Sequence, residues 1–194
     1  MAGANITWKG RTCKIVGVTT LNKSEYSVMP DRIEAGTYLI AGATMGGITL
    51  NNCNPKHLED VINKLKLSGA NISSNENSLS IEKIDSIESV DITTEVYPGF
   101  PTDLQAQWMA FMSVAKGKST IIDTVYHDRF THIPELNRLG ADIQLKDNKA
   151  IVDGVNKLKG AQVMSTDIRA SAALILGAII AEGKTEISRV KIFL

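Results

Sequence analysis

The chain has 194 residues, of which 43% are hydrophobic, so it can bury a substantial core and fits a single domain spanning residues 1–194. Lysine and arginine together number 21 and are balanced by 21 aspartate and glutamate residues, which excludes the bulk positive field used for nonspecific binding of nucleic acid or anionic membranes. Any anion site must be local, and we expect neither nucleic acid nor a membrane as a partner.

The two ends of the chain and its cysteines indicate the compartment. Residues 1–9 contain no apolar run of signal-peptide length, and the longest apolar run, residues 170–181, is too short to cross a bilayer. Cys13 and Cys53 are isolated, with neither a metal-ligand spacing nor a disulfide framework around them. We therefore expect a cytoplasmic protein with two ordinary thiols, no metal and no cofactor.

Residues 31–81 predict a helix, a strand, a second helix and a hairpin in that order. Asp31 opens an apolar stretch of helical length that ends at Gly46 and is followed by a short β-like run. Asn54 and Pro55 then open a helix with apolar residues at i, i+3, i+4 and i+7, closed by Gly69. The turn residues 74–77 favour a hairpin after it.

The same pattern returns about 70 residues later and begins a third time, which indicates a structural repeat. Asp103 and Asp167 open the later long helices, and the motif Gly-Ala-Asn-Ile at 69–72 returns as Gly-Ala-Asp-Ile at 140–143. We expect an α+β domain of three units over residues 27–96, 97–160 and 161–194, each with the order helix, strand, helix, strand, strand. The third unit is expected to be incomplete, because its second helix would begin near residue 200.

The long helices are apolar on all sides. Residues 170–181 show no polar face, and Leu104, Trp108, Phe111 and Met112 stand among few polar neighbours. Such helices are expected to be surrounded by other elements instead of lying on a surface.

Residues 97–107 form the most informative segment, since a loop bracketed by Pro98 and Pro101 runs directly into a helix. Thr102 and Gln105 have the spacing of a capping box, which leaves the Asp103 carboxylate partly free. An ordinary alternative is that Asp103 only favours the helix start, as Asp31 and Asp167 would at theirs. In the same way Arg169, a cation in a first helical turn, requires an anionic neighbour, which could be Asp167 or the carboxylate of another unit.

Four blocks, residues 30–37, 98–107, 129–136 and 160–171, closely resemble the UDP-N-acetylglucosamine enolpyruvyl transferases (the MurA family), in the same order. The resemblance extends from about residue 27 to the end and covers only the second half of such an enzyme. It implies an inside-out α/β barrel built from βαβαββ units with central helices, and a missing N-terminal domain. It also implies phosphoenolpyruvate and UDP-N-acetylglucosamine as substrates in peptidoglycan synthesis.

The resemblance also implies roles for six residues. Asp103 would contact the sugar hydroxyl and act as the general base, the backbone of Val125 and the ring of Tyr126 would meet the nucleotide sugar, and Arg129, Asp167 and Arg169 would line the cleft. His127 and Asp128 stand where the family commonly has Glu and Asn, so their roles stay open, and His127 alone is typical of a surface residue. The alternatives are the shikimate-pathway enolpyruvyl transferase, which lacks these motifs, and a noncatalytic module of the same fold.

Overall fold

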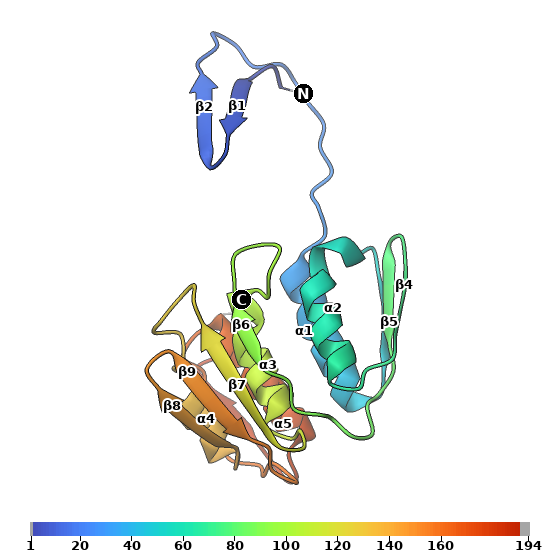
Figure 1. Ribbon diagram of the computed structural model, residues 1–194, viewed down its shortest axis with the longest axis vertical. Coiled ribbons are helices and arrows are strands. Elements are labelled where there is room, and N and C mark those ends of the chain that lie inside the picture. The colour runs from blue at the N-terminus through green and yellow to red at the C-terminus, as the bar shows by residue number, and fades with distance from the viewer. Residues whose placement is uncertain (1, 191–194) are drawn as a thin grey trace.

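The computed structural model describes residues 2–190, which form a compact body and an N-terminal hairpin held away from it (Figure 1). The hairpin consists of β1 (Asn5–Lys9) and β2 (Thr12–Val16). Residues 17–31 connect it to the body without helix or strand, and every residue from 3 to 31 is exposed.

The body repeats one order of elements, as the sequence pattern indicates. The first group comprises α1 (Arg32–Met45), β3 (Ile48–Asn51), a 3-10 turn (Pro55–Leu58), α2 (Glu59–Leu67), β4 (Ile72–Asn75) and β5 (Ser78–Ile81). The second comprises β6 (Ile92–Thr94), the short helix η2 (Thr102–Leu104), α3 (Gln105–Met112), β7 (Lys118–Asp123), α4 (Ile133–Arg138), β8 (Asp142–Lys146) and β9 (Lys149–Asp153). The third comprises β10 (Gln162–Met164), α5 (Ile168–Ile180) and β11 (Glu186–Ser188).

Strand pairing follows one scheme, which the second group shows in full and the first and third groups show in part. The strands before and after a long helix are parallel, as β6 is to β7 and β10 is to β11. The strand after the long helix then pairs antiparallel with the second strand of the hairpin, which gives the sheet orders β3-β5-β4 and β6-β7-β9-β8. The α+β class is confirmed. Residues 2–190 contain separate sheets and no closed barrel.

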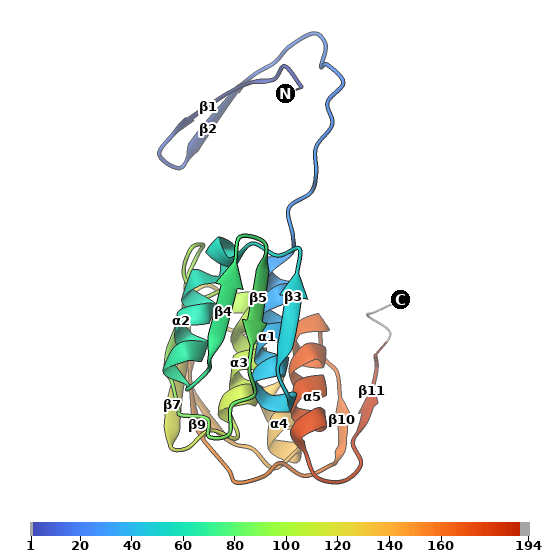
Figure 2. The same ribbon diagram turned by 90° about the vertical axis from the view of Figure 1, so that its right-hand side faces the viewer.

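The helices fill the middle of the body. α1 and α2 lie beside β3-β5-β4, and α3 lies beside the sheet of β6 to β9 (Figures 1 and 2). The paired strands β10 and β11 lie on one side of α5 (Figure 2). All eight residues of α3 are buried. Trp108 at its centre packs edge-on between Phe100 and Phe111, with ring centroids 5.4 and 5.3 Å away, and its indole Nε1 donates to the carbonyl of Val90.

One helix departs from the expected burial. Ala173 and Leu174 of α5 are fully buried, whereas Ile168, Ile175 and Ile179 are 47%, 39% and 50% exposed. The prediction that residues 170–181 are surrounded is therefore wrong for one face of α5, because no described element packs there. The sequence could not show this, since an apolar residue on a helix does not reveal whether its side is covered.

Trp108→Ala should lower the free energy of unfolding by about 3–5 kcal/mol, because it removes a fully buried indole. The cavity that is left cannot close, since the elements around α3 are packed on every side of it. Urea unfolding followed by far-UV circular dichroism measures the change. Trp8→Ala is the matched control, since Trp8 is 70% exposed, and it should stay within about 0.5 kcal/mol of the parent. Equal losses in the two variants would contradict the central position of α3.

Candidate functional site

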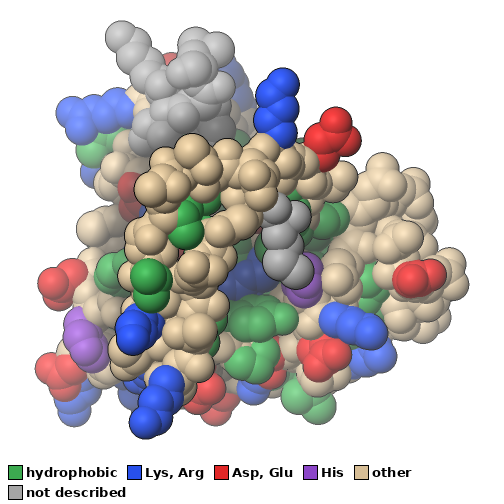
Figure 3. All heavy atoms as spheres, turned by 90° about the horizontal axis from the view of Figure 1, so that it is seen from above, with side chains coloured by type: hydrophobic (Ala, Val, Ile, Leu, Met, Phe, Trp, Pro, Cys, Tyr) green, Lys and Arg blue, Asp and Glu red, His purple; other side chains and the backbone are tan. Residues whose placement is uncertain are grey.

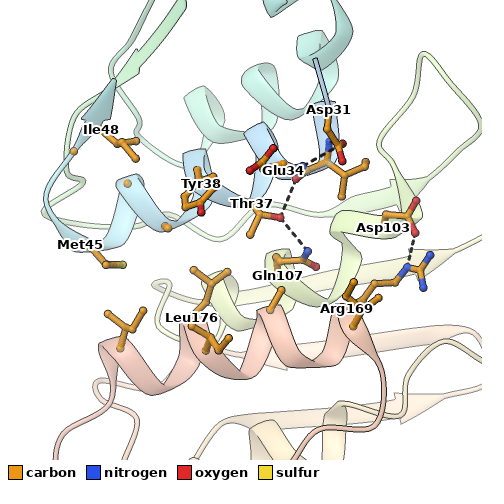
Figure 4. A pocket seen from close by; sticks show the side chains of 18 residues that line it. Asp31, Glu34, Thr37, Tyr38, Met45, Ile48, Asp103, Gln107, Arg169 and Leu176 are labelled. Atoms are coloured by element: carbon orange, nitrogen blue, oxygen red, sulfur yellow. Dashed lines mark hydrogen bonds and ion pairs between the residues drawn. The ribbon is translucent and has the colours of Figure 1, made fainter. Parts of the chain in front are cut away.

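Asp103 lies at the centre of a charged cluster built from three distant segments. Its Oδ1 accepts a hydrogen bond from Nη1 of Arg129 at 3.1 Å and another from Nε of Arg169. Arg129 comes from the loop after β7, and Arg169 comes from the first turn of α5; Figure 4 shows the pair of Asp103 and Arg169. The structure thus brings together three of the predicted site residues, and the anionic neighbour of Arg169 is Asp103.

Asp103 is not a helix cap, in contrast to the two aspartates that the repeat places equivalently. Asp31 accepts from the amides of Ile33 and Glu34, and Asp167 accepts from those of Arg169 and Ala170. Within residues 2–190, neither carboxylate oxygen of Asp103 accepts from a backbone amide, and only Oδ1 is hydrogen bonded. The capping part of the structural alternative therefore does not apply to Asp103, which still lies in the first turn of η2.

The predicted capping box of Thr102 and Gln105 is wrong. The N-cap of η2 is Pro101, without a side-chain hydrogen bond, and the Thr102 hydroxyl instead donates to Oδ2 of Asp123 at 2.7 Å. The Gln105 side chain turns to the carbonyl of Arg129. Both side chains are drawn into tertiary contacts that the local spacing does not reveal.

Asp123, at the end of β7, joins the segment of Asp103 to the loop of Val125 and is the site residue that the sequence analysis missed. It is fully buried, and its Oδ1 accepts from the Thr94 hydroxyl and from the amides of Val125 and Tyr126 at 2.7–2.9 Å. Burial acts to raise its pKa, but these donors and Thr102 outweigh burial and hold the pKa below its usual value. The sequence signal that could have identified Asp123 is its place as a carboxylate at the end of the strand β7.

The loop after β7 presents an aromatic ring beside the cluster. The Arg129 guanidinium stacks 3.9 Å from the centroid of the Tyr126 ring, which is 53% exposed. The amide of Val125 is already engaged by Asp123. His127 and Asp128 are exposed, as expected of surface residues.

Asp167 lies next to the cluster and shares its surroundings with a buried histidine. Burial acts to raise the pKa of Asp167, but the amides of Ala170 and Arg169, the Thr131 hydroxyl and His132 together lower it. His132 is 2% exposed, and its Nε2 has no hydrogen-bond partner among the described residues. Burial lowers the pKa of His132 to about 4, against an opposing effect of the Asp167 carboxylate.

A groove of about 800 Å³ separates α1 from α5 and reaches the cluster at one end (Figure 4). At the cluster end its lining is polar and includes Asp31, Glu34 and Asp103, with Gln107 donating to Thr37 across it. Farther along, the lining is apolar: Tyr38, Met45, Ile48, Ile175, Leu176 and Ile179.

The charges and the helices of the described residues limit the kinds of site. On the face shown in Figure 3, acidic and basic side chains are interspersed and form no broad patch of one sign. Residues 2–190 contain no group of three His, Cys, Asp or Glu side chains placed to hold a metal ion. Over the same range, no helix is both long enough and apolar enough to span a membrane.

Comparison with known proteins decides the family. Residues 1–193 match the family model described as EPSP synthase (3-phosphoshikimate 1-carboxyvinyltransferase). The chain belongs to this family. The fold agrees, since the enolpyruvyl transferase NikO from Streptomyces tendae superposes with a TM-score of 0.86 at 23% identity over 99% of this chain and 47% of its own. EPSP synthase from Acinetobacter baumannii gives a TM-score of 0.72 at 18% identity, over 96% of this chain and 47% of its own.

Within the EPSP synthase family, curated relatives at about 50% identity are UDP-N-acetylglucosamine 1-carboxyvinyltransferases, as the resemblance indicated. The protein from Chlorobium phaeovibrioides is 50% identical over 190 residues, which is 97% of this chain and 45% of the relative. That from Bdellovibrio bacteriovorus is 50% identical over 191 residues, covering 97% and 46%. The chain thus spans about half the length of the curated relatives it matches.

Asp123→Asn should loosen the loop after β7. The side-chain oxygen of asparagine is a weaker hydrogen-bond acceptor than a carboxylate oxygen, and the side-chain NH2 group would face groups that are themselves donors. We expect a loss of about 2–3 kcal/mol in unfolding free energy and at least about tenfold faster hydrogen exchange at the amides of Val125 and Tyr126. Nuclear magnetic resonance measures both. Asp91→Asn is the control, since Asp91 is exposed and, within residues 2–190, its carboxylate accepts only from the amide of Thr120. Unchanged exchange at Val125 would disprove the role of Asp123.

The buried His132 should make the fold sensitive to mild acid. Its folded pKa of about 4 lies below the ordinary 6.5, so the unfolded chain binds the proton first and stability falls as the pH drops from 6.5 to 4. The loss should approach about 3 kcal/mol. His132→Gln should flatten this slope, and His127→Gln, at an exposed position, should leave it intact. Urea titrations at several pH values distinguish the two variants. The pKa values of Asp123 and Asp167 are lowered from the usual 3.8, so these carboxylates lose their contribution to stability at a lower pH than His132 does.

Proposed function

We propose that this chain is the second half of an enzyme that transfers the enolpyruvyl group from phosphoenolpyruvate to UDP-N-acetylglucosamine, with release of phosphate, in cytoplasmic peptidoglycan synthesis. The observation that carries the proposal is the Asp103 carboxylate, which caps no helix and is held by two arginines at the end of an open groove. The names of the curated relatives support the substrates.

Asp103 is proposed as the general base. Arg129 and Arg169 occupy Oδ1 and fix the carboxylate, while Oδ2 is left to accept the proton of the sugar hydroxyl as that oxygen attacks the enolpyruvyl carbon. The hydroxyl proton passes to the carboxylate and the sugar oxygen bonds to the substituted carbon of the enolpyruvyl group. The bond between that carbon and the phosphate oxygen breaks, so that phosphate leaves with the electron pair and can take up the proton from the carboxyl group. Because both arginines bind Oδ1, they position the carboxylate and leave Oδ2 free to accept a proton.

The neighbouring residues are proposed to bind the nucleotide sugar. Arg129 covers one face of the Tyr126 ring, and the exposed face is available for stacking on a sugar or base. The backbone of Val125 lies in the same loop, and Asp167 holds the first turn of α5 from which Arg169 extends. We assign these residues, with Asp103, to substrate binding.

We further propose that the three units, residues 27–96, 97–160 and 161–194, form one inside-out α/β barrel domain that works with an N-terminal domain. The apolar end of the groove between α1 and α5 supports this, because α2 contacts α1, the long helix of its own unit, and α4 contacts α5, the long helix of the following unit. A third helix of the same type would fill the groove and cover Ile175 and Ile179. The remaining charge-stabilising groups of the reaction are assigned to the other domain.

Asp103→Asn tests the base in a chimera in which this chain replaces the matched 190 residues of the Chlorobium phaeovibrioides relative. The substitution keeps the shape of the side chain but removes proton acceptance, so turnover should fall by roughly 10²–10⁴ with little change in nucleotide-sugar binding. Phosphate release measures turnover, and calorimetry measures binding.

Asp31→Asn is the matched control, because Asp31 caps α1 and an asparagine can replace it as a cap. It should leave turnover within about twofold of the parent chimera. Equal effects at both positions would make Asp103 structural. The chain alone should release no phosphate, and turnover by the chain alone would refute the assignment of the other groups to a second domain and favour a self-sufficient site.

A further inference from the structure

Glu135 is a buried carboxylate that is bonded to the segment leading into α5. It lies in the first turn of α4 and is 7% exposed. Its Oε2 accepts a hydrogen bond from the backbone amide of Met164 at 2.8 Å, and its Oε1 lies 3.8 Å from Nε of Arg138. The Arg138 side chain is mostly exposed, so this ion pair adds little. The bond to Met164 is therefore the contact that sets Glu135 apart.

The start of α4 does not by itself account for this contact. An acidic residue in the first turn of a helix interacts favourably with the helix dipole, whichever way its side chain turns. At the third helical position, a glutamate commonly turns back to the amide of its own N-cap residue, which in α4 is His132. Glu135 instead reaches the backbone of a strand in the next unit.

The repeat does not require a carboxylate at this position either. Glu135 stands five residues before Gly140, and Lys64 of α2 stands five residues before the equivalent Gly69. Lys64 is half-buried, and its Nζ donates to the carbonyl of Asp91, next to β6, at 2.8 Å. The two helices thus bond the following unit with opposite chemistry, and the buried carboxylate belongs to the unit that precedes Arg169.

The edge of β10 that faces α4 explains why an acceptor is needed there. Among residues 2–190, β10 pairs with β11 alone, and the Ser165 amide donates to the carbonyl of Ser188 beside that pair. Successive amides of a strand point to opposite edges, so the Met164 amide points away from β11. An amide turned into the protein without an acceptor is costly, and Glu135 supplies that acceptor.

Met164 begins the segment that sets the position of Arg169. Three residues later, the Asp167 carboxylate accepts from the amide of Arg169 at 2.8 Å and starts α5. Thr131, two residues before α4, donates to the same carboxylate at 3.4 Å, so the start of α4 contacts this segment at two places. From the first turn of α5, Arg169 reaches Oδ1 of Asp103 through Nε.

We propose that Glu135 is a positioning residue for the proposed transferase reaction. By holding the Met164 amide it fixes residues 164–167, and through them the first turn of α5, where Arg169 binds the Asp103 carboxylate. Glu135 acts through Arg169 and not on the substrate. This role rests on the proposed function, because the position of Arg169 affects turnover only if Asp103 is the base.

Hydrogen exchange at Nε of Arg169 in the chain alone tests the position without reference to catalysis. Glu135→Met keeps the length of the side chain but removes the acceptor, so the Nε proton should exchange at least about tenfold faster, as its bond to Asp103 opens more often. Glu135→Gln keeps an acceptor oxygen and should stay within about threefold of the parent. Nuclear magnetic resonance measures the exchange rate.

Lys64→Met is the matched control, since it removes the hydrogen bond at the equivalent position of α2, and it should leave exchange at Arg169 unchanged. Unchanged exchange in Glu135→Met overturns the proposal. Equal acceleration in Lys64→Met or in Glu135→Gln also overturns it, because the effect is then a general loosening or a loss of charge.

A cooperative melting transition establishes that each variant is folded. Glu135→Asp, whose carboxylate is one methylene too short to reach Met164, replaces Glu135→Met if the methionine variant does not fold. Failure of both variants to fold overturns the proposal, since Glu135 is then a determinant of folding.

Turnover in the chimera links the position of Arg169 to the reaction. Glu135→Met should lower the rate of phosphate release about tenfold, whereas Glu135→Gln should stay within about threefold and Lys64→Met within about twofold of the parent chimera. If Glu135→Met speeds exchange at Arg169 but leaves turnover intact, the positioning role fails while the proposed function stands. A folded parent chimera without turnover instead refutes the proposed function, and the exchange measurement still decides whether Glu135 holds Arg169.

Discussion

Burial of α3 on all sides is the constraint on which the rest of the body depends. A short helix whose eight residues are all inaccessible needs neighbours in every direction, and α1, α5 and the sheet of β7 and β9 supply them. Its two buried glutamines each donate one hydrogen bond, Gln107 to Thr37 of α1 and Gln105 to the carbonyl of Arg129, while the Oε1 atom of each has no partner among residues 2–190. These buried amides fix the rotation of the helix, which apolar contacts alone would leave less well defined.

The candidate site lies at the start of this buried helix. η2 leads directly into α3, so the backbone at Asp103 is fixed by a core element, while its side chain reaches the surface beside Arg129 and Arg169. Asp123 adds a second anchor through Thr102. Rigid backbone with a partly exposed carboxylate is the arrangement expected where a reactive group must be held in one orientation without being removed from water.

The sequence predicts the elements well and their surroundings poorly. Asp31, Asp167, Gly46 and Gly69 mark helix ends by backbone chemistry that is local, and the structure confirms them. The donors around Asp123, the partners of Thr102 and the open side of α5 depend on which distant segments meet, and no local pattern records that. The charged cluster could be anticipated only through resemblance, because its residues are 26 and 66 positions apart.

The two tryptophans occupy opposite extremes of solvent contact. Trp108 is sealed among aromatic rings and donates its indole proton to a backbone carbonyl, whereas Trp8 lies almost fully in water on the hairpin. The chain thus carries two indole fluorophores with separate environments: Trp108 emits from a rigid apolar interior, and Trp8 is open to dissolved quenchers. Spectral changes in the body and in the N-terminal hairpin can consequently be resolved from one another without attaching any dye.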